Sequence, residues 1–108
     1  MTLVRVELLY FDDCASYPAL RLRVERLLAD HGFTGHLELV RIASREEAES
    51  RRFLGSPTLR VDGCDVEPGA DERTDFGIKC RIYASVEGLK PTPSDELIVA
   101  ALGRAGGS

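Results

Sequence analysis

The segment Gly55-Ser56-Pro57-Thr58 separates two predicted elements of different kinds. Before it, Ser44 is followed three residues later by Glu47, a capping-box pattern that predicts a helix continuing to Phe53. After it, the β-branched and apolar residues of Thr58–Val61 predict a strand. The segment is therefore expected to lead from a helix into a strand.

Elements on either side extend this pattern. Asp62-Gly63 is a strong hairpin signal, so residues 64–67 are expected to return antiparallel. Upstream, Leu3–Phe11 reads as a buried strand that ends in a loop, and Tyr17–His31 has apolar residues at helical spacing. His36–Ile42 alternates as a second strand should.

The last third of the chain has weaker signals. Gly69–Lys79 is polar without periodicity and is expected to be a long surface excursion, followed by a short extended piece at 81–83. Ser94 is expected to cap a final helix that ends at Gly103, with a frayed tail at 105–108.

The predicted order is β-α-β-α-β-β-α in a single domain, 1–108, since 108 residues support one core. Alternating elements require crossovers, which predicts a central mixed sheet with helices on its faces. This is the topology of a thioredoxin-like fold. The pattern alone also allows a ferredoxin-like arrangement or another compact α/β sandwich.

Composition narrows the function classes. With 44% hydrophobic and 30% charged residues, the chain is expected to be a globular protein rather than a disordered one. A net charge of -4 argues against nucleic acid as a partner. No apolar run is long enough for a membrane helix, and no signal peptide or anchor is recognised, so we expect a cytoplasmic protein without a membrane partner.

Three cysteines, an odd number, disfavour a disulfide scaffold in such a compartment. They form no C-x-x-C pair, and His31 and His36 have no ligand-like spacing to a cysteine. We therefore expect neither a structural metal site nor a cofactor.

Two segments resemble the thioredoxin-like superfamily: Phe11-Asp-Asp-Cys14-Ala-Ser-Tyr17-Pro18 after the first strand, and Gly55-Ser56-Pro57-Thr58 before the third. The resemblance implies that Cys14 occupies the site position and that Pro57 is a cis-proline packed beside it. It also implies that the backbone of Ser56 faces a bound peptide or thiol. X-Pro bonds adopt the cis form at a cost of only about 0.5–1 kcal/mol.

The departure from that family is the missing second cysteine, since Tyr17 stands in its place. A local dithiol mechanism therefore cannot operate. The chain also resembles small bacterial thioredoxin-like proteins labelled alkylmercury-lyase-like, through the segments 53–58 and Cys80-Arg-Ile-Tyr83.

Cys14 precedes a predicted helix, whose unpaired N–H groups favour a thiolate, so it is the candidate nucleophile. Neighbouring acidic residues and a late helix start oppose this effect. The Tyr17 hydroxyl is a candidate hydrogen-bond donor to a thiolate or substrate, the alternative being a ring packed on the helix start. Asp13 could donate a proton in carbon–metal bond cleavage, or could simply be solvated.

The other cysteines differ in their expected reach. Cys80 follows the polar excursion and could fold back over the first loop as a remote resolving thiol or soft ligand, the alternative being a buried apolar residue. Cys64 follows the hairpin turn and is expected at the far end of the sheet from Cys14.

Three functions remain open. The first is single-cysteine thiol–disulfide exchange, with Cys14 attacking and Cys80 or a small thiol resolving the mixed species; its partner is a protein or small-molecule thiol or disulfide. The second is binding or lysis of a soft metal or organomercurial by Cys14 and Cys80. The third is a non-catalytic binding or homodimerisation module with a buried, inert Cys14.

Overall fold

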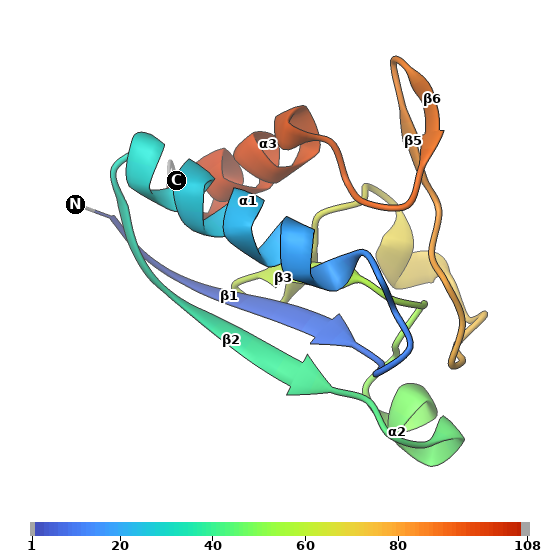
Figure 1. The fold of residues 1–108 in the computed structure, drawn as a ribbon. Coiled ribbons are helices and arrows are strands. Elements are labelled where there is room, and N and C mark those ends of the chain that lie inside the picture. Colours follow the sequence, from blue (N-terminus) through green and yellow to red (C-terminus); the bar gives the residue numbers. More distant parts are fainter. Residues whose placement is uncertain (1, 107–108) are drawn as a thin grey trace.

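The computed structural model describes residues 2–106, and a four-stranded mixed sheet lies at the centre of this part of the chain (Figure 1). The strand order is β2-β1-β3-β4. The central strand β1 (Thr2–Tyr10) pairs in parallel with β2 (Phe33–Arg41) and antiparallel with β3 (Thr58–Val61). The edge strand β4 (Cys64–Asp65) pairs antiparallel with β3.

Two helices cover one face of this sheet. A parallel pair such as β1 and β2 needs a crossover, and α1 (Tyr17–Asp30) supplies it. The final helix α3 (Asp95–Gly106) lies beside α1 on the same face (Figure 1). Together they bury the main core, to which β1, β3, α1 and α3 contribute Val4, Val6, Leu8, Leu20, Val24, Leu28, Leu59, Val61, Ile98, Ala101 and Leu102.

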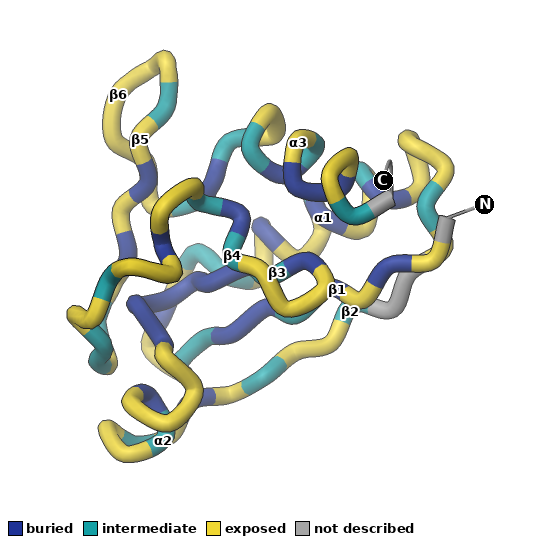
Figure 2. The backbone as a smooth tube through the Cα atoms, turned by 180° about the vertical axis from the view of Figure 1, so that it is seen from behind, coloured by how far each residue is buried: buried dark blue, intermediate teal, exposed yellow. Residues whose placement is uncertain are grey.

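The opposite face carries a second, smaller cluster. Successive side chains of a strand point to opposite faces, so Leu9 lies across the sheet from Leu8. It packs with Ile42, Ala48 and Phe53, which brings the short helix α2 (Arg45–Ser50) onto this face. Figure 2 shows the resulting pattern, with β1 and β3 largely buried and most of α2 exposed. The predicted α/β class, with helices on both faces of a mixed sheet, is confirmed.

Local signals acted as expected at the capping box and the hairpin. Ser44 Oγ accepts the Glu47 N–H at 3.1 Å, and Glu47 Oε1 accepts the Ala43 N–H at 3.3 Å. Asp62 and Gly63 both have positive φ, 50° and 84°, as a tight two-residue hairpin turn requires.

Several predicted boundaries were wrong. Strand β2 begins at Phe33 rather than at His36. Helix α2 ends at Ser50 rather than Phe53, because Arg52 has a φ of 55° and a right-handed helix requires negative φ. The strand predicted at 64–67 stops at Asp65, whose Oδ1 accepts the Glu67 N–H at 2.9 Å and turns the chain. Helix α3 continues past Gly103 to Gly106, because its last turns still pack against the core.

The surface excursion contains more structure than predicted. A short 3₁₀ helix, η1 (Ala70–Glu72), lies within 69–79. The piece expected at 81–83 becomes strand β5 (Tyr83–Ser85), which forms a separate hairpin with β6 (Gly88–Lys90). This hairpin projects from the body of the molecule (Figure 1).

Candidate functional site

The loop that carries Cys14 turns directly after β1. The Cys14 N–H donates to the Phe11 carbonyl at 3.1 Å, which closes the turn. Helix α1 begins directly after Ser16, whose side chain makes no capping hydrogen bond. The Cys14 residue is only 5% exposed. Its thiol is therefore largely covered by protein, which is the feature expected of the non-catalytic alternative.

The side chains flanking this loop are engaged with neighbours. Tyr17 stacks on Tyr10 with ring centroids 4.0 Å apart and an interplanar angle of 17°, which matches the packing alternative for its ring. Asp12 accepts two hydrogen bonds from Arg41, and these lower the pKa of its carboxyl group. Asp13 is exposed, and its role as a proton donor stays a prediction.

The Ser56–Pro57 peptide bond is cis, as predicted, and both residues are buried. The backbone of Ser56 was expected to face a ligand, but it pairs with the chain's own segment 79–81. Its N–H donates to the Lys79 carbonyl at 2.8 Å, and its carbonyl accepts the Arg81 N–H at 3.0 Å. These two bonds form an isolated parallel bridge in which Ser56 lies opposite Cys80.

Cys80 is exposed, so it is not the buried apolar residue of the alternative interpretation. The residue that Cys80 pairs with is Ser56 of the cis-proline loop, and its expected position over the first loop stays a prediction. Gly55 makes the approach possible: its φ is +125°, and an added Cβ would lie 3.0 Å from the Lys79 carbonyl oxygen. Segment 79–81 therefore packs tightly on the backbone before Pro57.

The sheet register relates this contact to the Cys14 loop. Leu9 near the end of β1 pairs with Thr58 at the start of β3, directly after Pro57. The loop leaving β1 and the 79–81 segment thus lie at the same end of the sheet (Figure 1). Exposed Cys64 pairs with Val61 at the opposite end of β3, as predicted.

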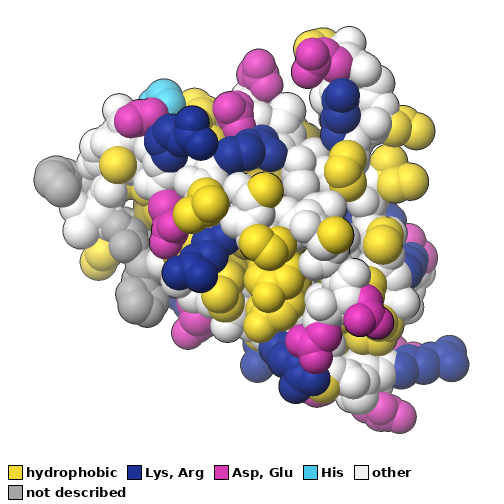
Figure 3. Space-filling view, in the orientation of Figure 1, with side chains coloured by type: hydrophobic (Ala, Val, Ile, Leu, Met, Phe, Trp, Pro, Cys, Tyr) yellow, Lys and Arg dark blue, Asp and Glu magenta, His cyan; other side chains and the backbone are white. Residues whose placement is uncertain are grey.

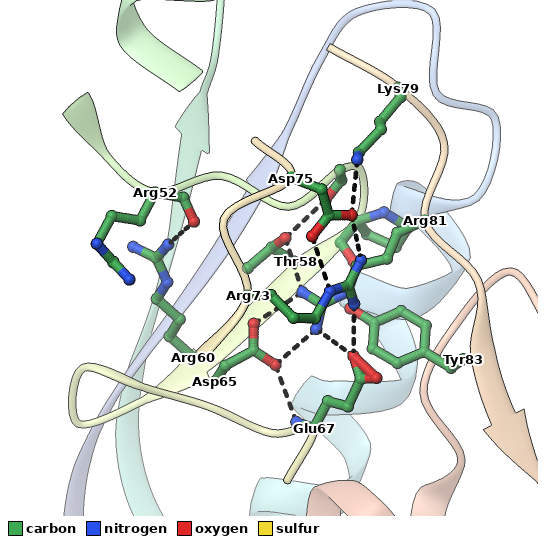
Figure 4. A network of polar contacts seen from close by, with 12 residues as sticks. Arg52, Thr58, Arg60, Asp65, Glu67, Arg73, Asp75, Lys79, Arg81 and Tyr83 are labelled. Atoms are coloured by element: carbon green, nitrogen blue, oxygen red, sulfur yellow. Dashed lines mark hydrogen bonds and ion pairs between the residues drawn. The ribbon is translucent and has the colours of Figure 1, made fainter. Parts of the chain in front are cut away.

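A buried arginine next to Cys80 is the main feature that the sequence did not reveal. The Arg81 guanidinium donates to Asp65 at 2.7 and 2.9 Å, to Glu67 at 2.7 Å and to the Thr58 hydroxyl at 3.0 Å (Figure 4). Burial is the largest single influence and lowers the pKa of Arg81, but the hydrogen bonds to Asp65 and Glu67 and the charges around them together raise this pKa above its ordinary value. No local sequence pattern predicts this cluster, because its residues come from three separate segments of the chain.

The Tyr83 side chain packs against the Arg81 guanidinium and so belongs to the same cluster. Its ring lies 4.5 Å from the guanidinium carbon of Arg81, and its hydroxyl donates to the Pro57 carbonyl at 2.6 Å. Burial raises the pKa of this hydroxyl far above its usual range, so it acts as a fixed donor. The cis-proline loop is therefore held on its inner side by Tyr83 and along its edge by segment 79–81.

A separate hollow lies beside β4. Its volume is about 590 Å³, and its lining includes Arg51, Arg52, Arg60, Cys64 and Phe76. Arg60 there donates to the carbonyls of Arg51 and Arg52 at 2.6 and 3.1 Å, so it satisfies the end of α2. Burial lowers the pKa of Arg60. We assign this hollow a structural origin.

Comparisons with protein-family models, with curated proteins and with solved structures found no match for this chain.

Within residues 2–106, no three Cys, His, Asp or Glu side chains gather as a metal site would require. Cys14, Cys64 and Cys80 all carry free thiols. No helix in the described part of the chain is long and apolar enough to cross a membrane.

Proposed function

We propose that this protein is a thioredoxin-like thiol–disulfide exchange protein in which Cys80 attacks and Cys14 resolves. The strand order, the crossover helix α1 and the cis bond before β3 support the thioredoxin-like assignment. The observation that carries the function is the bridge between Ser56 and Cys80, which seats an exposed cysteine on the cis-proline loop.

The difference in exposure sets the two roles. Only a thiolate that can reach an external sulfur can begin exchange, and Cys80 is exposed whereas Cys14 is 5% exposed. A covered thiol is suited to the second, internal step. This order reverses the one expected from the sequence, where Cys14 was the nucleophile.

The reaction balances with an external disulfide as oxidant. The Cys80 thiolate attacks one sulfur of that disulfide, forming a mixed disulfide and expelling the first thiolate. The Cys14 thiolate then attacks the Cys80 sulfur, forming the Cys14–Cys80 disulfide and expelling the second. Two cysteine thiols are oxidised, the external disulfide is reduced to two thiols, and a small thiol of the glutathione type reverses both steps.

Single substitutions of the three cysteines test this proposal. We expect oxidised glutathione to convert the wild type and Cys64→Ser into a form two mass units lighter, with Cys14 and Cys80 crosslinked. Cys14→Ser should instead accumulate a glutathione adduct on Cys80, and Cys80→Ser should form neither product. Cys64→Ser is the matched control, since Cys64 is also exposed but lies at the other end of β3. An unchanged oxidation pattern in Cys80→Ser would overturn the proposal.

Two observations favour the binding or dimerisation module as a second candidate: the Cys14 thiol is largely covered, and the Ser56 backbone is already hydrogen-bonded within the chain. In that case the wild type forms no internal disulfide in the same experiment.

The soft-metal function stays a prediction, which titration of the Cys14→Ser and Cys80→Ser variants with mercuric ion would test.

A further inference from the structure

We propose that Arg81 is a positioning residue that holds Cys80 on the cis-proline loop. This inference rests on the proposed function, because it explains how the attacking thiol keeps a fixed place. The Arg81 side chain is 1% exposed and runs into the protein, while the preceding Cys80 is exposed. Arg81 thus anchors the segment through its buried side chain, while the neighbouring Cys80 is exposed to solvent.

The Arg81 side chain contacts three segments of the structure. The Arg81 guanidinium contacts β3 through Thr58, β4 through Asp65 and the following turn through Glu67. Its own backbone N–H donates to Ser56. Any movement of segment 79–81 away from Ser56 would therefore pull a buried cation from its carboxylates, which is strongly unfavourable.

The ion pairs continue in a chain that returns to the other neighbour of Cys80 (Figure 4). Glu67 also accepts from Arg73 at 3.1 Å, Arg73 donates to Asp75 at 2.7 Å, and Lys79 donates to Asp75 at 2.9 Å. Hydrogen bonds from Arg73 and then Lys79 hold the pKa of Asp75 well below its usual value. Residues 79 and 81 are thus the two ends of one ion-pair chain, and Cys80 lies between them.

Arg81 and Lys79, the two ends of the ion-pair chain, differ in how far they are buried, so substitutions at these two positions make a matched pair. The Lys79 side chain is 41% exposed, so its ion pair is weakly coupled to the fold. Removing the charge at Arg81 should release segment 79–81, whereas removing it at Lys79 should leave the segment in place. A released Cys80 loses its fixed geometry, and the effective concentration of one thiol at the other falls.

The experiment compares Arg81→Met with Lys79→Met. The readout is the equilibrium between the Cys14–Cys80 disulfide and a glutathione redox buffer, which reports the effective concentration of the two thiols. We expect a fall of about tenfold or more in Arg81→Met and less than about twofold in Lys79→Met. Arg81→Lys, which keeps the charge but not the forked contacts, should lie between them.

A second readout does not depend on the disulfide. The rate of iodoacetamide alkylation at Cys80, divided by that at Cys64 in the same molecule, should rise about threefold or more in Arg81→Met as segment 79–81 leaves Ser56. Where Arg81→Met fails to fold, Glu67→Gln applies the same test more mildly. An unchanged disulfide equilibrium and alkylation ratio in folded variants would overturn the inference. A wild type without an internal disulfide, but with an altered ratio in Arg81→Met, would overturn the proposed function alone.

Discussion

Two short extended segments, 79–81 and β6 (Gly88–Lys90), lie close in sequence but differ in what holds them. The first pairs with the buried backbone of Ser56 and sends a buried arginine into the sheet. The second pairs only with β5, and all of its residues are exposed. Figure 3 shows hydrophobic side chains standing at the edge of the face where Figure 1 places this hairpin.

The comparison shows that extended backbone conformation alone does not anchor a segment. Segment 79–81 has only one bridge partner, yet it is tied to β3, β4 and the cis-proline loop through side chains. The hairpin has more strand pairing, but among the large hydrophobics Val86 and Leu89 project into solvent. Local opening should therefore be easier at β5–β6 than at 79–81.

Gly55→Ala should have the largest effect among substitutions that test the anchoring of segment 79–81. The φ of +125° at this position is unfavourable for alanine, and the new Cβ would lie 3.0 Å from the Lys79 carbonyl oxygen. We therefore expect a loss of about 2–3 kcal/mol in the free energy of unfolding. Gly63→Ala is the control, since Gly63 also has positive φ but has nothing within 4 Å of the added Cβ. Equal losses in urea denaturation of the two variants would show that the close approach costs nothing.

Tyr83→Phe should have an intermediate effect. It removes the hydroxyl that donates to the Pro57 carbonyl at 2.6 Å and leaves a buried acceptor unpaired, which predicts a loss of about 1–2 kcal/mol. The measurement is thermal or urea unfolding against Tyr10→Phe, because Tyr10 is only half-buried. A loss no greater than that of Tyr10→Phe would mean that this hydrogen bond does not stabilise the loop.

Val86→Ser should have the smallest effect. Val86 is fully exposed in the turn of the β5–β6 hairpin, so its replacement should change the free energy of unfolding by no more than about 0.5 kcal/mol. Urea denaturation measures this directly. A clear destabilisation would contradict the view that the part of the hairpin beyond the buried Tyr83 is held only by its own strand pairing.

The sequence predicts most of the sheet and helices because their signals are local. The alternation in β1, the capping box at Ser44 and the turn at Asp62-Gly63 each act within a few residues. Helix α3 passed through Gly103 because packing against the core outweighed the helix-ending tendency of glycine. Strand β6 was missed, and β5 was expected two residues too early, at 81–83, because three residues are too few to show a period.

The candidate site divides in the same way. The cis bond at Pro57 was predicted. Cys80 pairs with Ser56 of the cis-proline loop, and its expected position over the first loop stays a prediction. The occupation of the Ser56 backbone by segment 79–81 was not predicted, because long-range backbone pairing leaves no pattern in the sequence. The buried Arg81 was equally hidden, since its carboxylate partners lie 14 and 16 residues away.

The ion-pair chain around Cys80 also sets how salt should act on the molecule. The side-chain exposure of its basic members rises from 1% at Arg81 through 35% at Arg73 to 41% at Lys79. Dissolved ions screen exposed charges far more than buried ones. Rising ionic strength should therefore weaken the ion pairs from the Lys79 end inward, while the buried contacts of Arg81 persist and segment 79–81 stays paired with Ser56.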